Sequence, residues 1–547
     1  MARREEHVGF VTTATIQGVE AVMVTVEVSV GSGLPGIHIV GMPDTAIQEA
    51  KQRVRQALKA AHFEMRNRFV VVNLAPSSLK KVGSGFDLPI ALGFLIATGQ
   101  INPELVKNRL CIGELSLDGS VRAVAGQLAY EQVVQTQGLG FMTGPTVAGV
   151  FARQGQEHVC LEHLSDLRSG RFTEPEPASM LQGGSCADYA DIAGNDLAKR
   201  ALQIAAAGSH GLLMVGPPGS GKSMMAGRLP SILPPLPESE RIESALIHSV
   251  AGLPFEQILQ GERPFRSPHH GASRAGLIGG GNPTRAGEVS LAHNGVLFLD
   301  ELPEFGSSVL QLLRQPMEQG FVTLARASGT VSFPARFMLV AASNPCPCGF
   351  FGDPKRSCAC TPPQISRYQG RVGGPLMDRI EIAVDVWRSD PAHVLDTGKG
   401  TTSAQMKEGV MRARAFAVWR QARDEAQGLP PTQGLPPTQE LLSTQGLSPT
   451  LGSQVCDAVR EDPISEVPRA DVRGSGVALL AACRLGTRER ASLEMMAERY
   501  HLSGRGIMCA LGVARTIADM EESEKVTGAH LLEAVSFRRN DRESAAA

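Results

Sequence analysis

The sequence lacks several features that define whole classes of proteins. No run of 18 apolar residues occurs in its 547 residues, and the charged start MARREEHVGF has no apolar segment behind it, so we expect neither a membrane span nor a signal peptide. Ten cysteines are too few for a disulfide scaffold, which predicts a cytoplasmic protein. Aromatic residues make up only 5%, so base stacking cannot dominate any nucleic-acid binding. A net charge of −2 excludes a histone-like DNA coat, although a local basic patch remains open.

The texture of the sequence predicts an α/β protein of several units. Residues 1–164 alternate strand-like and helix-like runs, and residues 165–186, rich in Pro, Gly and Ser, are typical of a linker. Residues 187–390 follow a strand–loop–helix pattern, and residues 391–547 are mainly helical. Within this last part the motif QGLPPT recurs and degenerates over residues 427–450, which predicts an exposed insertion without a function of its own.

One motif predicts a nucleotide site. It fits the pattern G-x4-G-K-S/T, which occurs by chance in roughly 3 of 100 such chains, and it follows the apolar run 212–215. Glycines allow backbone amides to wrap phosphates, the lysine reaches the β- and γ-phosphates, and the final hydroxyl ligates Mg²⁺. The predicted ATP ligands are Gly216, Pro217, Pro218, Gly219, Ser220, Gly221, Lys222 and Ser223.

Two further apolar runs end in polar residues that complete this chemistry. The run 295–299 ends at Asp300 and Glu301, which predicts a carboxylate that holds Mg²⁺ and a second that activates the attacking water. The run 337–342 leads to Asn344, which we expect to position that water, although alone it would more often be a turn residue. Together with the phosphate loop, these residues predict an NTPase.

Longer strings extend these motifs into a resemblance. They are DIAG at 191–194, RSPHH at 266–270, GEVSLAHNG at 287–295, NPCPCG at 344–349, GPLMDRIE at 374–381 and ARTIAD at 514–519. The chain resembles the magnesium-chelatase-like branch of the AAA+ ATPases, and within it the ComM-like family of proposed DNA branch-migration helicases of natural transformation. The resemblance implies an AAA+ core at 187–390, a helical lid at 391–547 and a hexameric ring.

The same resemblance assigns two arginines to catalysis. Arg379 resembles the finger that reaches the γ-phosphate of a neighbouring subunit, and Arg505 resembles the second sensor donated by the lid. A planar guanidinium can bind phosphate oxygens with two hydrogen bonds, which suits either role. The alternative for each is an ordinary ion pair, for which Asp378 or Glu381 would serve Arg379.

Basic residues in two inserts are candidates for DNA contacts. One insert, 262–285, has four arginines against one glutamate, and the other, 321–333, alternates around a glycine as a β-hairpin does. In related rings both inserts point into the pore and grip DNA. We expect phosphate contacts there, although each arginine could equally form bonds within its own subunit. The candidates are Arg263, Arg266, Arg274, Arg285 and Arg326.

Four thiols within 15 residues predict a metal knuckle. Cys346 and Cys348 are followed by Cys358 and Cys360, a set that suits tetrahedral Zn²⁺ in a structural site. Reduced thiols are the alternative, since C-x-C spacing is less usual than C-x-x-C.

The N-terminal region resembles the α+β proteolytic domain of Lon proteases, a fold of the ribosomal protein S5 domain 2 type. The strings PSSLKKVGSGFDLP at 76–89 and GELSLDGSVRAVAG at 113–126 carry this resemblance. In register with them, the nucleophile falls on Gly85 and the catalytic lysine on Leu128, so a Ser–Lys dyad cannot form. We therefore expect an inactive Lon-like domain at 1–164 that serves assembly or binding.

These observations favour an ATP-driven ring that moves branched DNA. Two other functions remain open: a chelatase-type ATPase that remodels a metal-insertion enzyme, and a chaperone-like ring that acts on protein clients. The Lon-like domain and the four cysteines argue against the chelatase function, because neither is expected in a chelatase motor subunit.

Overall fold

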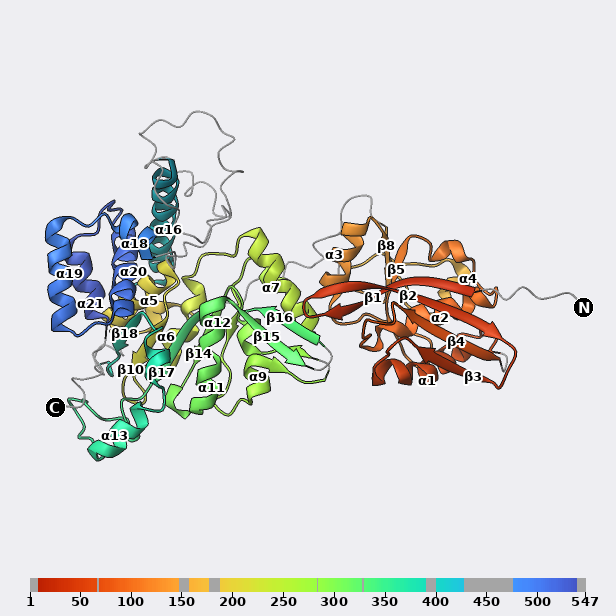
Figure 1. The fold of residues 1–547 in the computed structure, drawn as a ribbon, viewed down its shortest axis with the longest axis horizontal. Helices are drawn as coiled ribbons and strands as arrows, with labels where there is room; N and C mark the ends of the chain where they lie inside the picture. The colour runs from red at the N-terminus through yellow and green to blue at the C-terminus, as the bar shows by residue number, and fades with distance from the viewer. Residues whose placement is uncertain are drawn as a thin grey trace, which may run out of the picture.

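The chain folds into two sheet-containing units and a helical bundle that follow one another in space as they do in sequence (Figure 1). The computed structural model describes residues 8–65, 68–146, 157–176, 187–282, 284–326, 329–389, 400–426 and 476–538. The predicted insertion at 427–450 lies outside these residues. In the described part of the chain, no helix is both long enough and apolar enough to cross a membrane.

The N-terminal unit is a seven-stranded mixed sheet with helices on both faces, because alternate residues of its strands enter two separate hydrophobic cores. Its strand order is β3 (Gly36–Val40), β4 (Phe69–Ala75), β2 (Glu20–Gly31), β1 (Val8–Gln17), β5 (Arg109–Cys111), β8 (Gly140–Thr143) and β9 (His158–Cys160). The helices are α1 (Thr45–Ala60), α2 (Asp87–Ala97) and α3 (Gln127–Gln137). Every residue of α2 is buried, as expected of a sequence that is apolar after its first residue, and that residue, Asp87, accepts hydrogen bonds from Arg53 at 2.6 and 3.0 Å. Burial alternates along β2 and β4, as expected of strands with one face on the core.

The predicted linker begins too early. Its first residues form α4 (Asp166–Ser169), Leu167 is buried in the core of the N-terminal unit, and Thr173 pairs with Cys160 beside the sheet. The sequence prediction failed because these few apolar side chains show no periodicity of their own and are buried only by the preceding fold. The N-terminal unit therefore extends at least to residue 176, and residues 177–186 lie outside the described part.

The second unit is built on a five-stranded parallel sheet. Its order is β11 (Phe265–Arg266), β14 (Val296–Leu299), β17 (Met338–Ser343), β10 (Leu212–Val215) and β18 (Ile382–Asp385). Strands β10, β14 and β17 are buried along their whole length, as expected of a parallel sheet covered on both faces. Alternate residues of each strand enter two separate hydrophobic cores, one with α5 (Asp196–Gly208) and the lid, the other with the inserts. The predicted α/β class is confirmed.

Further elements surround this sheet. They are α6 (Lys222–Gly227), α7 (Glu238–Ala251), α8 (Glu256–Leu259), α9 (Arg274–Ile278), β12 (Gly279–Gly280), β13 (Arg285–Ala286), α10 (Glu288–Leu291), α11 (Ser307–Leu312), α12 (Arg314–Gln319), β15 (Phe321–Arg326), β16 (Gly329–Pro334), α13 (Pro362–Gln369) and α14 (Gly374–Met377). Two short strands of the N-terminal unit, β6 (Glu114–Leu115) and β7 (Val121–Arg122), pair with each other. Strands β15 and β16 pair in antiparallel register from Phe321↔Pro334 to Arg326↔Gly329, which confirms the predicted hairpin.

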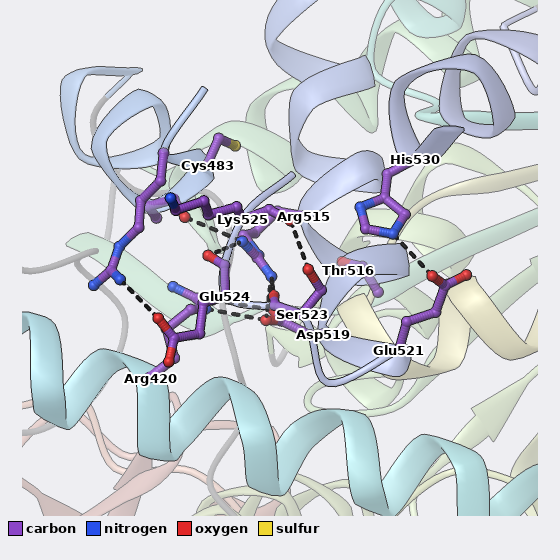
Figure 2. Close-up of polar contacts among 12 residues, drawn as sticks. Arg420, Cys483, Arg515, Thr516, Asp519, Glu521, Ser523, Glu524, Lys525 and His530 are labelled. Carbon is purple, nitrogen blue, oxygen red and sulfur yellow. Dashed lines mark hydrogen bonds and ion pairs between the residues drawn. The ribbon is translucent and has the colours of Figure 1, made fainter. Parts of the chain in front are cut away.

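The C-terminal unit is a bundle of helices with charged groups in its interior. It consists of α16 (Ser403–Ala426), α18 (Gly476–Cys483), α19 (Thr487–Arg499), α20 (Gly504–Met520) and α21 (Gly528–Ser536). Asp519 accepts hydrogen bonds from Arg420 of α16 at 3.0 Å to each oxygen, and Arg515 lies 3.0 Å away on α20 (Figure 2). All three side chains are nearly inaccessible to solvent. This network joins the end of α16 to α20.

Helix α3 of the N-terminal unit packs on α7 of the second unit. Leu128 and Ala129 form one apolar cluster with Leu236, Ala245, Leu246 and Ile258. Two backbone amides at the start of α3 reinforce this contact, since Gly126 donates to the Ser249 carbonyl at 2.8 Å and Leu128 to its hydroxyl at 3.2 Å. The two units are therefore joined by a packed interface as well as by the chain.

Candidate nucleotide site

The phosphate loop lies at the carboxyl edge of the parallel sheet. It leaves β10 at Gly216 and enters α6 at Lys222. Gly219 and Gly221 adopt φ of +77° and +89°, a left-handed backbone that favours glycine. Gly216 is needed for a different reason, because a Cβ there would lie 2.0 Å from the Val386 carbonyl oxygen. The loop thus has the backbone shape that the motif predicts.

Lys222 is held inside this loop by carbonyl oxygens. Its Nζ donates to Gly216 O at 2.7 Å and to Pro217 O at 3.0 Å. Burial lowers the pKa of Lys222 to about 8, while the carboxylates of Asp300 and Glu301 act in the opposite direction. The ammonium is therefore confined next to the place where the loop would hold phosphates.

The predicted magnesium ligands are brought together. Ser223 Oγ donates to Asp300 Oδ2 at 2.6 Å, although 77 residues separate them in the sequence. Asp300 directly follows β14, and the register of the parallel sheet brings the ends of β10 and β14 to one edge. A hydroxyl and a carboxylate are hard oxygen donors, so this pair fits Mg²⁺.

Asn344 lies at the same edge of the sheet, directly after strand β17. Strand β17, which it follows, is hydrogen-bonded to β10 on one side and β14 on the other. Lys222 Nζ donates to Asn344 Oδ1 at 3.3 Å. The amide is thus adjacent to the lysine that would meet the γ-phosphate, which is where a group that orients a water must be.

Glu301 has a partner to which the sequence assigned no role. Its backbone adopts φ +53° and its side chain is exposed, with Oε2 3.4 Å from His270 Nδ1. His270 follows β11, another parallel strand that ends at the same sheet edge, and packs edge-on against Phe305. His270 lies four residues beyond β11, and this place after a parallel strand was the signal that could have revealed it.

Arg388 is a second residue that sequence reasoning missed. It follows β18 at the same edge, and its Nη2 and Nε donate to Pro218 O in the phosphate loop at 3.0 and 3.2 Å. In the sequence, only the position of Arg388 just beyond a strand could have indicated that it belongs to the site.

Arg379 and Arg505 lie at the opposite edge of the sheet. Arg379 precedes β18, whose first residue pairs with Leu212 at the start of β10. A strand of this length separates it from the phosphate loop of its own chain by about 13 Å. Both guanidiniums approach the half-exposed carboxylate of Glu318, the buried Arg379 as an ion pair and Arg505 at 3.6 Å, beside a cavity of about 350 Å³. Burial lowers the pKa of Arg379, and the positive charge of Arg505 lowers it further.

Two of the arginines predicted to contact DNA form hydrogen bonds within their own subunit. Arg263 is 8% exposed and donates to Pro234 O at 2.7 Å and Asn294 O at 2.6 Å. Arg266 forms a two-bond ion pair with Glu288 at 2.6 and 2.7 Å. The prediction that Arg263 contacts DNA is wrong, because its buried guanidinium binds backbone carbonyls of its own subunit. For Arg266, whose side chain is 30% exposed, the DNA contact stays a prediction.

The remaining candidates differ from these two. Arg274 begins α9 and Arg285 lies in β13, and both are exposed. The side chain of Arg326 lies outside the described part of the structure.

The four cysteines form a cluster with metal-site dimensions. Their sulfur atoms lie within 4.8 Å of one another, and Cys346, Cys348 and Cys358 are 3.4 to 3.6 Å apart. Four sulfurs bound tetrahedrally at 2.3 Å would be about 3.8 Å apart. The geometry therefore fits the predicted zinc, with the thiolates as its four ligands.

Comparison with known proteins places the whole chain in one family. The family described as "Magnesium chelatase, subunit ChlI" matches residues 188–394, "Subunit ChlI of Mg-chelatase" matches 26–143, and "Magnesium chelatase, subunit ChlI C-terminal" matches 456–538. The chain is 36% identical to the uncharacterized protein YifB of Escherichia coli over 97% of both chains, and 36% identical to the competence protein ComM of Haemophilus influenzae over 95% of both. The chain belongs to the magnesium-chelatase-like ComM family.

Family membership makes the phosphate-loop unit the core of an AAA+ ATPase. A more distant relative, the magnesium-chelatase 67 kDa subunit of Chlorobaculum parvum, is 31% identical over only 29% of this chain and 23% of its own. The match of residues 26–143 to a chelatase-subunit family also means that an N-terminal unit cannot by itself argue against a chelatase-type function.

The positions that correspond to a Lon catalytic dyad have structural roles in this chain. A Cβ on Gly85 would lie 2.8 Å from Ile112 Cγ1, so the space for a nucleophile is filled. Leu128, the lysine position, is buried in the contact with α7. The likeness to Lon proteases and the expected absence of peptide cleavage both stay predictions.

Proposed function

We propose that the chain is the subunit of an ATP-hydrolysing hexameric ring that moves branched DNA, in branch migration during homologous recombination and natural transformation. The observation that carries the ring is the separation of Arg379 from the phosphate loop of its own chain by the length of the sheet. An arginine at that edge can complete only a neighbouring subunit's site. Arg505 lies beside it, so we infer that it also serves the neighbour.

Each catalytic residue has a role that its position permits. Lys222 and the loop amides bind the phosphates, and Ser223 with Asp300 holds Mg²⁺, which would neutralise phosphate charge. Glu301 accepts a proton from the attacking water, and Asn344 orients that water. Arg379 from the neighbour meets the charge that develops on the γ-phosphate. To reach it, Arg379 must leave Glu318, so we expect that ion pair to open when the ring assembles.

The DNA contacts are proposed for a surface made by two inserts. The β15–β16 hairpin packs against the α9 insert, since Leu324 belongs with Leu277 and Ile278 to one hydrophobic core. Arg274 and Arg285 are exposed on the α9 insert, residues 262–285, and Arg326 of the hairpin remains a candidate. In a ring, six copies of these few arginines would form a positive collar without making the whole chain basic.

Glu301→Gln tests the proposed motor directly. The amide cannot accept the proton of the attacking water, so the variant should bind ATP and a synthetic Holliday junction as the wild type does but should not move the junction. Branch migration is followed by native gel electrophoresis, and Glu304→Gln, at an exposed carboxylate that pairs with Arg371, is the control. The proposal fails if wild-type protein neither binds branched DNA nor forms rings with ATP.

The alternative is an AAA+ ATPase that remodels a protein partner, of the chelatase or chaperone type. The match to a chelatase subunit of Chlorobaculum favours it, but that match covers 29% of the chain, whereas the match to ComM covers 95%. DNA-stimulated ATP hydrolysis supports the motor. A rate of ATP hydrolysis that is unchanged by DNA but increases with a protein partner supports the alternative.

A further inference from the structure

The four-cysteine knuckle, residues 346–360, touches the phosphate loop. It starts two residues after Asn344 and ends where α13 begins, with Gln369 Nε2 donating to Pro345 O at 3.0 Å. Among the described residues, no other group of cysteine, histidine or acidic side chains has metal-site dimensions. The knuckle therefore lies next to the nucleotide site, and a hydrogen bond joins the residue that precedes it to the helix that follows it.

The first contact is made by Gly349. Its backbone packs so closely on the ring of Pro218 that a Cβ at this position would lie 2.5 Å from Pro218 Cδ and 3.1 Å from Cγ. Pro218 is the third residue of the phosphate loop. The knuckle backbone is thus in close contact with the phosphate loop at Pro218.

The second contact passes through Arg388. Phe350 of the knuckle has the guanidinium of Arg356 at 4.4 Å from its ring centroid and that of Arg388 at 5.3 Å, within the range of cation–π attraction. The same Arg388 donates two hydrogen bonds to Pro218 O. The guanidinium of Arg388 therefore joins Phe350 of the knuckle to the carbonyl of Pro218. Pro218 is the same residue whose ring packs on Gly349.

We propose that the metal-bound knuckle positions the phosphate loop, so that occupancy of the four-cysteine site by Zn²⁺ sets the affinity for ATP. Four thiolates on one ion hold the loop ends 346–348 and 358–360 together, and Gly349 and Phe350 lie within the segment that they enclose. Without the ion, the support of Pro218 relaxes. Gly349, Phe350 and Arg388 are positioning residues in this scheme, and the inference rests on the ATP-binding part of the proposed function.

The test compares two glycines of the same loop. Gly349 and Gly352 have φ of +82° and +77°, so alanine imposes similar backbone strain on both, but a Cβ on Gly352 meets only Trp387 at 3.7 Å. Gly349→Ala should weaken binding of a fluorescent ATP analogue on the order of tenfold or more. Gly352→Ala should stay within about twofold of wild type. Both should retain one zinc per subunit by elemental analysis.

Two further measurements keep the test decisive if Gly349→Ala does not fold. Arg388→Ala, at an exposed side chain, should weaken binding of the analogue without loss of zinc. Wild-type protein stripped of zinc by a chelator under reducing conditions should lose affinity and regain it when Zn²⁺ alone is added back. Equal affinity of zinc-free, folded protein, or of Gly349→Ala, overturns the inference. If wild-type protein itself does not bind the analogue, the ATP-binding proposal fails instead.

Discussion

At the scale of single residues, Lys222 is the buried charged group of the nucleotide site, whereas Ser223 and Glu301 are exposed. Lys222 is enclosed by the phosphate loop, and its ammonium donates hydrogen bonds to two carbonyl oxygens of that loop, those of Gly216 and Pro217. Burial alone would favour the neutral amine, and the nearby carboxylates oppose this only in part. A group balanced in this way responds to pH close to the physiological range.

We expect Lys222 to make the affinity of the protein for nucleotide depend on pH. Its pKa in the empty site is about 8, and only the protonated form can bind phosphate, so affinity should fall as the pH rises through that value. We expect ATP to bind about tenfold more weakly at pH 9 than at pH 7, from the linkage between protonation and binding. Isothermal titration calorimetry across this range measures the change.

Lys222→Arg is the matched control for this prediction. A guanidinium stays protonated throughout the range, so the variant should lose affinity overall but should lose its pH dependence as well. A wild-type affinity that is constant between pH 7 and pH 9 contradicts the prediction.

At the scale of elements, the lid is held by charges that are buried together. The string ARTIAD, residues 514–519, contains two of these charged residues, Arg515 and Asp519. Arg515 and Asp519 face the interior of the bundle, where Asp519 also binds Arg420 of α16 (Figure 2). The sequence suggested nothing of this contact, because Arg420 and Asp519 are 99 residues apart.

Asp519→Ala should destabilise the lid strongly. The change leaves two buried guanidiniums without their shared carboxylate, a loss that costs about 3–5 kcal/mol in comparable buried pairs. Differential scanning calorimetry and hydrogen exchange of α20 measure it. The control is Glu521→Ala, whose half-exposed carboxylate pairs with His530 at 2.9 Å and should cost within about 1 kcal/mol. Equal effects of the two substitutions would show that the buried network does not hold the bundle together.

At the scale of the whole molecule, the N-terminal unit is docked on the ATPase core, and Arg379 and Arg505, which we propose to be catalytic, lie at the sheet edge opposite to the phosphate loop of their own chain. Lys80 Nζ donates to Asn282 Oδ1 at 3.3 Å and adds a polar contact to the apolar one between α3 and α7. Motions of α7 and of the α9 insert during ATP turnover would therefore reach the N-terminal unit. Two experiments address these two features of the assembly.

Leu128→Asp should separate the N-terminal unit from the core. The leucine is 1% exposed within the apolar cluster between α3 and α7, where a carboxylate would have no partner. Deuterium uptake of amides in α3 and α7 should rise, as measured by mass spectrometry. Leu117→Asp in the same unit, at a side chain 62% exposed, is the control and should leave uptake unchanged. Unchanged protection of α7 in Leu128→Asp would mean that this contact is not needed for docking.

A mixing experiment tests whether Arg379 acts on a neighbour. Arg379→Ala and Lys222→Ala rings should each be inactive in ATP hydrolysis, the first from loss of the finger and the second from loss of the phosphate lysine. Random mixing of the two subunits should restore about a quarter of wild-type activity, because a head-to-tail interface then pairs an intact loop with an intact arginine. No recovery in mixed rings of confirmed composition would place Arg379 outside the neighbour's site.

The sequence by itself determined the chemistry at the strand ends. A phosphate loop, a buried strand that ends in two carboxylates and a third that leads to Asn344 are local patterns, and in a parallel sheet the carboxyl ends of such strands lie at one edge. Ser223, Asp300 and Asn344 therefore come together as their spacing predicts. The hairpin at 321–333 and the α/β class are equally local in origin.

Only the tertiary structure decided how distant segments use their charges and apolar side chains. Arg263 and Arg274 lie in the same basic insert, yet one is buried among carbonyls and the other is exposed. Arg379 and Arg505 converge on Glu318, and the first residues of the predicted linker complete a core. Each outcome depends on which groups from elsewhere in the chain approach within a few ångströms, and no periodicity within a segment records that.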